Sequence, residues 1–113
     1  MIQIYHNLRC RKSRECLAFL EESGHEYEII NYLENIPTFE ELKSIIEKLN
    51  IKAIELIRKK EKIWIENFKN KTMSENEIIH AMISNPILIE RPIVIYGKKA
   101  AIVRPLEKIR VIF

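Results

Sequence analysis

Cys10 is the residue of this chain whose neighbours best prepare it to act as a nucleophile. It stands where a short apolar run, residues 2–5, gives way to a helical pattern, so it falls at the start of a helix. Backbone N–H groups and the positive end of the helix dipole stabilise an anion there. Four flanking cations favour the thiolate further: Arg9, Arg11, Lys12 and Arg14. The pattern therefore predicts a reactive thiolate, the form of cysteine that attacks electrophiles.

Two polar residues near Cys10 are candidates for a supporting role. Ser13 follows one helical turn later, where it can donate a hydrogen bond to the thiolate or to a bound anion, or simply cap the first turn. His6 lies in the loop before Cys10, where it can tune the thiolate, relay protons or fill a purely structural place. The backbone N–H groups at the helix start can also hold a tetrahedral oxyanion.

The second cysteine, Cys16, is predicted to be a core residue and not a partner for Cys10. Six residues along a helix correspond to about 9 Å of rise with side chains roughly 120° apart. A disulfide usually needs Cα atoms within about 6.8 Å. Cys16 also shares an apolar stripe with Leu17 and Leu20. The electrons that restore Cys10 must then come from an external thiol.

Composition narrows the class of protein. The chain has 113 residues, which favours one domain, and only two glycines, which excludes a glycine-rich phosphate loop. A net charge of +3 in two short basic clusters is too weak a signal for direct nucleic-acid binding. His25 and His80 have no companions at metal-ligand spacing, so no metal site is expected. No signal peptide or membrane span is recognisable, so we expect a cytoplasmic protein in which both cysteines are free.

The order of predicted elements is strand, helix, strand, helical segment, two strands and a terminal helix. Capping boxes at Thr38–Glu41 and Ser74–Glu77 begin two helices of the middle segment. Residues 53–57 are expected as a short helix and residues 58–72 as an irregular or part-helical stretch. The remaining elements are expected at 2–5, from 10 to Gly24, at 27–32, 93–96 and 100–103, and from Pro105. A crossover helix between the first two strands implies a parallel pair, so the prediction is an α/β fold with a four-stranded mixed sheet.

Five stretches, taken together and in this order, resemble one known family. They are IYHNLRCRKSR at 4–14, YLEN at 32–35, ELIRKK at 55–60, NPILIERPIV at 85–94 and VRP at 103–105. The chain resembles the ArsC family, which comprises the glutaredoxin-coupled arsenate reductases and relatives such as the Spx-like regulators. The resemblance extends over essentially the whole chain.

The resemblance implies a thioredoxin-like fold and assigns roles to particular residues. It implies a single domain, 1–113, with a helical insertion at approximately 36–86. The nucleophile falls on Cys10, the histidine that influences it on His6 and the accompanying serine on Ser13. Three arginines that hold the oxyanion, and the cis-proline that faces the cysteine, fall on Arg58, Arg91, Arg104 and Pro92. Guanidinium groups suit a tetrahedral oxyanion such as arsenate.

The implied activity is reduction of arsenate or a similar oxyanion with glutathione as co-substrate, glutaredoxin as electron donor and no tightly bound cofactor. A monomeric protein is expected. Two departures concern the loop at Cys10: Leu8 stands where proline is frequent, and Arg11-Lys12 where Gly-Thr is typical. Two alternatives stay open. One is a related glutathione-dependent thiol reductase with another substrate. The other is a non-enzymatic Spx-like regulator that binds RNA polymerase, although Ser13 occupies the place of that branch's second cysteine.

Overall fold

The computed structural model describes residues 1–7, 9–104 and 106–112. The chain divides into two compact units, one formed by Met1–Asn35 with Arg91–Phe113 and the other by Ile36–Glu90. Each unit is described by itself. The expected single domain with an insertion at about residues 36–86 stays a prediction.

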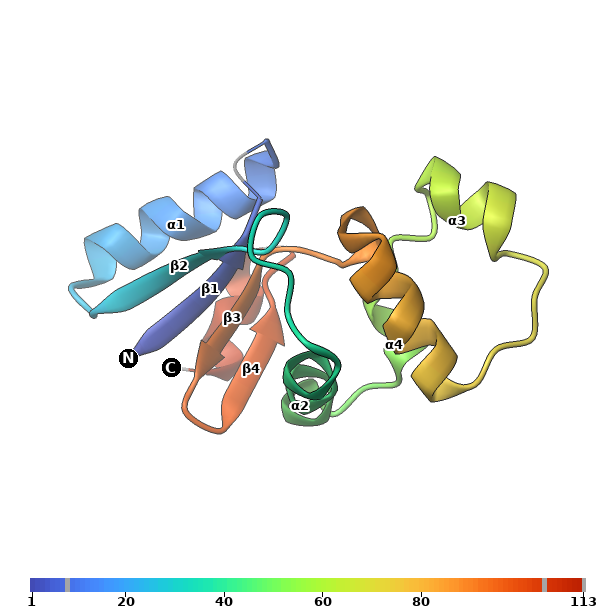
Figure 1. The fold of residues 1–113 in the computed structure, drawn as a ribbon. Coiled ribbons are helices and arrows are strands. Elements are labelled where there is room, and N and C mark those ends of the chain that lie inside the picture. The colour runs from blue at the N-terminus through green and yellow to red at the C-terminus, as the bar shows by residue number, and fades with distance from the viewer. Residues whose placement is uncertain (8, 105, 113) are drawn as a thin grey trace. The chain divides into compact units, whose positions relative to one another are not determined.

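The first unit is built on a four-stranded mixed sheet (Figure 1). The strands lie in the order β2-β1-β3-β4, with β1 and β2 parallel and the other two pairs antiparallel. This topology confirms the predicted α/β sheet. The elements are β1 (Ile2–His6), α1 (Arg11–Ser23), β2 (Tyr27–Asn31), β3 (Ile93–Tyr96) and β4 (Lys99–Ile102). Helix α1 ends at Gly24, whose φ of 78° is a left-handed conformation that glycine adopts without strain.

One face of this sheet carries the core of the first unit. Alternate residues of the strands, among them Ile4 and Val94, point to that face. Helix α1 packs on it through Cys16 and Leu20, which are completely buried. The prediction that Cys16 is a core residue is confirmed.

The C-terminal segment Leu106–Val111 covers the same face as a 3₁₀ helix, η3, through Ile109. The sequence predicted a helix here without its type, and the tighter 3₁₀ form is usual for short segments. The predicted place of Pro105 in its first turn lies outside the described residues. Strand β4 begins at Lys99, one residue earlier than predicted, because Lys99 pairs with Tyr96 across the two-residue turn at Gly97.

The second unit is helical, and two of its helices, at 39–49 and 75–84, begin at the capping residues that the sequence marks. Both predicted capping boxes form. Thr38 Oγ1 accepts from Glu41 N at 3.2 Å, and Ser74 Oγ accepts from Glu77 N at 3.2 Å. Helix α3 makes residues 58–72 part-helical, as expected. The elements are α2 (Phe39–Leu49), η1 (Ala53–Leu56), α3 (Lys62–Asn67), α4 (Glu75–Ser84) and η2 (Pro86–Leu88). The 3₁₀ turn η2 was not predicted, since Asn85-Pro86 indicated only the end of a helix.

Candidate active site

Cys10 is the N-cap residue of α1. Its backbone is extended (φ −91°, ψ 121°), and its carbonyl oxygen accepts the first helical hydrogen bond from Arg14 N at 3.1 Å. An N-cap side chain normally accepts a hydrogen bond from the helix, as the oxygen of serine or aspartate does. The side chain of Cys10 makes no such cap. Its sulfur still lies near the backbone N–H groups of Lys12 and Ser13, which lower its pKa.

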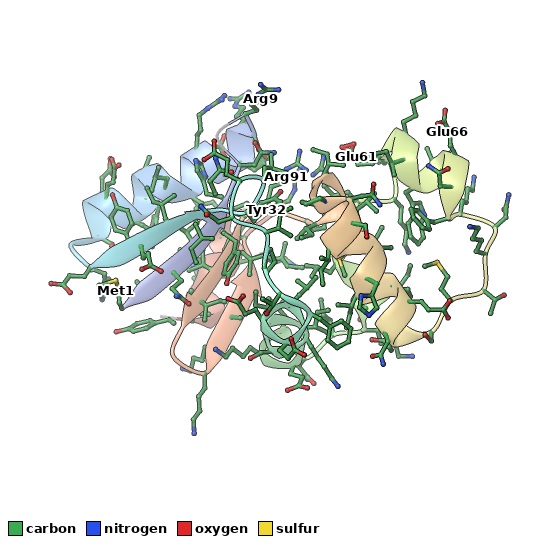
Figure 2. The ribbon with its side chains drawn as sticks, in the orientation of Figure 1. Met1, Arg9, Tyr32, Glu61, Glu66 and Arg91 are labelled. Carbon is green, nitrogen blue, oxygen red and sulfur yellow. The ribbon has the colours of Figure 1, made fainter. Side chains whose placement is uncertain are left out.

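Arg104 brings a positive charge to the sulfur of Cys10 from the far end of the sequence. Its Nη1 lies 3.6 Å from Cys10 Sγ and donates to the carbonyl oxygen of Arg91 at 3.2 Å. The two arginine segments are held beside each other because Val103 N donates to Pro92 O at 2.9 Å. The peptide bond between Arg91 and Pro92 is cis. Figure 2 shows the position of Arg91 within the first unit.

The surroundings of Cys10 lower the pKa of its thiol to about 7, from an ordinary value of 9.0. Partial burial acts in the opposite direction and is the largest single influence, because it disfavours the charged form. Hydrogen bonds outweigh it: from the backbone N–H groups of Ser13 and Lys12, and from the side chains of Arg91 and Ser13. The ionised fraction of the thiol at neutral pH is therefore much larger than that of an ordinary cysteine, which makes the sulfur an effective nucleophile.

Asn7 organises the turn before Cys10, and sequence reasoning did not single it out. It is almost fully buried. Its carbonyl oxygen accepts from Cys10 N at 2.9 Å, and its side-chain Oδ1 accepts from Arg9 N at 3.0 Å. Its own N–H donates to Ser13 Oγ at 3.3 Å. The signal was available, because asparagine commonly accepts from the backbone two residues further on in turns.

Ser13, near the start of α1, and His6 are both completely buried. His6 is the last residue of β1, so the prediction that it lies in the loop was wrong: the strand runs one residue further because His6 pairs with Asn31 of β2. The hydroxyl of Ser13 links the turn at Asn7 to the thiol of Cys10. Burial, and then the positive charge of Arg14, lower the pKa of His6, while the Ser13 backbone raises it to a smaller extent. Neither ring nitrogen of His6 has a hydrogen-bond partner among the described residues. Burial and the nearby Arg14 charge therefore favour the neutral form of the His6 imidazole.

Arg58 belongs to the second unit, where two carboxylates accompany it. Its Nη1 lies 3.3 Å from Glu90 Oε1, and its Nε lies 3.7 Å from Glu61 Oε1. Its backbone N–H donates to Leu88 O at 2.7 Å. The oxyanion-binding role that the resemblance gives Arg58 stays a prediction.

Cys16 is chemically the opposite of Cys10. Both cysteines are free, but burial in the core raises the pKa of the Cys16 thiol to about 12. Cys16 therefore remains a protonated, inaccessible thiol at neutral pH. Over the described ranges, no group of three or more His, Cys, Asp or Glu side chains is arranged to hold a metal ion. Within the same ranges, no helix combines the length and the apolar character needed to cross a membrane.

The geometry suits an attack on an electrophilic anion. A sulfur with a lowered pKa lies beside the guanidinium groups of Arg91 and Arg104, and such groups can neutralise the charge of a tetrahedral oxyanion. The first unit thus combines a nucleophile with anion-binding groups within one small region.

Comparison with known proteins gives matches over nearly the full length. The model of the ArsC family matches residues 5–112. The uncharacterized protein YfgD of Escherichia coli is 44% identical over 110 residues, which cover 96% of this chain and 92% of that protein. An arsenate reductase of Neisseria meningitidis is 39% identical over 113 residues, which cover 98% of this chain and 97% of that protein.

Solved structures match equally well. The arsenate reductase from Vibrio cholerae aligns with a TM-score of 0.94 and 39% identity, covering 99% of this chain and 97% of that one. This likeness, together with the strand order, confirms the predicted thioredoxin-like fold.

Proposed function

The chain belongs to the ArsC family, and from that premise we propose that it is an arsenate reductase with Cys10 as its nucleophile. The relatives named arsenate reductase, at about 40% identity over nearly the whole chain, support this activity. The observation that carries the proposal is the placement of Cys10 Sγ, whose pKa is lowered to about 7, at 3.6 Å from Arg104.

Arsenate reduction by thiols can be written on these residues with all atoms accounted for. The Cys10 thiolate attacks arsenic(V), an arsenate oxygen leaves as water after protonation, and a sulfur–arsenic bond remains. A second thiol then attacks the sulfur of Cys10, the sulfur–arsenic bond breaks, and its electron pair stays on arsenic. Arsenic leaves as arsenite, reduced by two electrons, and the two sulfurs are joined as a disulfide.

The arginines and polar residues divide the remaining tasks. Arg91 and Arg104 hold the arsenate oxygens and stabilise the charge that develops on them. The family pattern implies a third oxyanion-binding guanidinium at Arg58, and that role rests on the resemblance alone. Ser13 supports the thiolate by a hydrogen bond, and neutral His6 limits the positive charge near it. Pro92, with its cis peptide bond, faces Cys10.

Glutathione is proposed as the second thiol and glutaredoxin as the protein that releases it from Cys10. Cys16 does not resolve the mixed disulfide, since its thiol is buried and its pKa is raised to about 12. An external thiol is then required. The protein is further proposed to act as a monomeric single domain in the cytoplasm, without a tightly bound cofactor.

The test is a coupled assay with purified protein, arsenate, glutathione and glutaredoxin, in which glutathione reductase consumes NADPH at the rate of turnover. We expect NADPH consumption only when the protein, arsenate, glutathione and glutaredoxin are all present. Folding and the low thiol pKa of Cys10 are verified in the same sample. Absence of turnover in such a sample contradicts the proposed activity.

A further inference from the structure

Three cations flank Cys10 in the sequence at the start of α1 and are here called the basic collar: Arg9, Arg11 and Lys12. All three are exposed, with 84% of the Arg11 side chain and 45% of the Lys12 side chain accessible to solvent. Figure 2 shows Arg9 at the N-terminal end of α1. We propose that the basic collar binds the carboxylates of the small anionic thiol that reduces the arsenic on Cys10. This inference rests on the proposed function and names the chemistry of its second substrate.

The collar places charge where the helix itself disfavours it. Cations at a helix N-terminus and anions at its C-terminus both oppose the helix dipole. The first turn of α1 contains no acidic residue, and its last turn contains no basic residue. Instead, Arg11 and Lys12 begin the helix while Glu21 and Glu22 stand near its end. Helix stability therefore does not explain the collar, and its side-chain charges are not among the groups that lower the pKa of Cys10. A role in binding an anion from solution is in keeping with both observations.

The internal compensation of this charge is incomplete. Glu15 lies 3.3 Å from Arg11 Nε and 3.8 Å from Lys12 Nζ, so one carboxylate serves two cations. In both pairs the cation precedes the anion, which is the weaker orientation on a helix. These contacts are exposed and exchange readily with a ligand carboxylate.

The collar is separate from the groups assigned to arsenate. Arg91 is buried, and Arg104 lies at the sulfur itself. The side chains of the collar are exposed to solvent. The second reactant must arrive from solvent after arsenic has occupied the sulfur. Glutathione fits this surface because it carries two carboxylates and a net negative charge. A cluster of cations raises the encounter rate with such a ligand by long-range attraction.

The test uses thiol–disulfide exchange, which probes the collar without arsenate. The Cys10 thiolate attacks one sulfur of a disulfide, a mixed disulfide forms on Cys10, and the other half leaves as a thiolate. Three reagents are compared: glutathione disulfide, which is anionic, 2-hydroxyethyl disulfide, which is neutral, and cystamine, which is cationic. The variant Arg9→Gln/Arg11→Gln/Lys12→Gln is set against wild type. The neutral reagent corrects for any change in the reactivity of the thiolate itself.

We expect the triple variant to lose about three- to tenfold in rate with glutathione disulfide relative to the neutral reagent, and to gain with cystamine. Added salt should remove the preference of wild type, because it screens exposed charges beyond about 8–10 Å. The matched control is Lys98→Gln, an exposed cation at the turn between β3 and β4, at the opposite sheet end from Arg104. It should leave all three rates unchanged.

The thermal midpoint of unfolding distinguishes a binding role of these residues from a structural one. Arg11→Gln should raise the thermal midpoint by roughly 1–3 °C, since it removes a cation that opposes the helix dipole. Equal rates with all three reagents in wild type and variant would overturn the proposal, as would a lowered midpoint with no selective loss. A loss seen only in reduction by glutaredoxin would overturn it too, in favour of a protein partner. Failure of arsenate turnover in wild type with the charge preference intact would count against the proposed arsenate activity alone.

Discussion

The N-termini of α1 and α2 are built from opposite chemistry. Helix α2 begins on Thr38, whose hydroxyl accepts from the helix, and its first turn carries Glu40 and Glu41. Helix α1 begins on Cys10, which makes no side-chain cap, and its first turn carries Arg11 and Lys12. Helix α4 follows the pattern of α2, with Ser74 as its cap and Glu77 in its first turn.

The starts of α2 and α4 stabilise their helices, whereas the start of α1 stabilises a thiolate. An oxygen cap contributes about 1 kcal/mol, and each well-placed terminal charge contributes about 0.3–1 kcal/mol. α2 and α4 obtain both contributions. α1 forgoes them and leaves its terminal N–H groups available to stabilise a thiolate. Stability at this helix end is given up in exchange for an activated sulfur and an anion-binding surface.

The largest expected effect distinguishes the cysteine at the start of α1 from the cysteine within it. Cys10→Ser should lower arsenate reduction by about 10³-fold or more, because a serine hydroxyl is not ionised at neutral pH and cannot form the disulfide. Cys16→Ala is the matched control and should retain most of the activity, with a moderate loss of stability from the small cavity. The coupled NADPH assay measures both. Loss of turnover in folded Cys16→Ala would show that Cys16 takes part in the reaction.

Arg104→Gln should give the next largest effect. Removing the guanidinium 3.6 Å from the sulfur takes away a charged hydrogen bond, worth about 1.5–3 kcal/mol, or roughly 10- to 150-fold in kcat/KM for arsenate. The pKa of Cys10 should rise in the same variant. Arg104→Lys keeps the charge without the planar fork and should fall between Arg104→Gln and wild type. An unchanged kcat/KM in Arg104→Gln would show that Arg104 does not bind arsenate.

The pH dependence of alkylation distinguishes the two thiols without any substrate. The rate at Cys10 should fall about tenfold for each pH unit below 7 and level off above it, since only the thiolate reacts. The folded pKa lies below the unfolded one, so the linked stability is fully present above about pH 9. It is lost as the pH falls through about 7. Cys16 should stay unreactive throughout, and a midpoint near 9 at Cys10 would show that its thiol is not activated.

Substitutions at the caps of α2 and α1 should give the smallest effects. They should change the free energy of unfolding in opposite directions. Thr38→Ala should cost about 1 kcal/mol in the free energy of unfolding, because α2 loses its cap. Cys10→Asp should stabilise by about 0.5–1 kcal/mol, because a carboxylate caps α1 and faces its cations, while activity disappears. Urea unfolding of the two variants measures both changes. A destabilised but folded Cys10→Asp protein would mean that the start of α1 is optimised for stability after all.

Local signals explain how much of the fold could be predicted from the sequence. Both capping boxes, the left-handed Gly24 and the strands of the hairpin depend on a few neighbouring residues. All of them formed, with β4 shifted by one residue from its predicted place. The short 3₁₀ turns η2 and η3 were missed or left without a type, because α and 3₁₀ patterns hardly differ over three to six residues. The burial of Cys16 followed from its place in an apolar stripe.

The candidate site was harder to predict from the sequence, since it joins residues that are far apart in the chain. The helix start was enough to predict an activated Cys10, but the side chains of the flanking cations are not among the groups that lower its pKa. Nothing in spacing or periodicity could bring Arg104 to a sulfur 94 positions away, and only the family resemblance pointed to it. The three hydrogen bonds of Asn7 were missed because attention fell on charged and nucleophilic groups. The ion pairs of Arg58 with Glu61 and Glu90 were likewise invisible to motif reasoning.

The most direct test of an arsenate-reducing Cys10 is the mass of the protein after one turnover without glutaredoxin. The protein is incubated with glutathione, with and without arsenate, and its peptides are mapped by mass spectrometry while arsenite is quantified. The account predicts one glutathionyl group on Cys10, formed only with arsenate and matched by one arsenite released per protein. An adduct on Cys16, or arsenite formed without an adduct on Cys10, would contradict it.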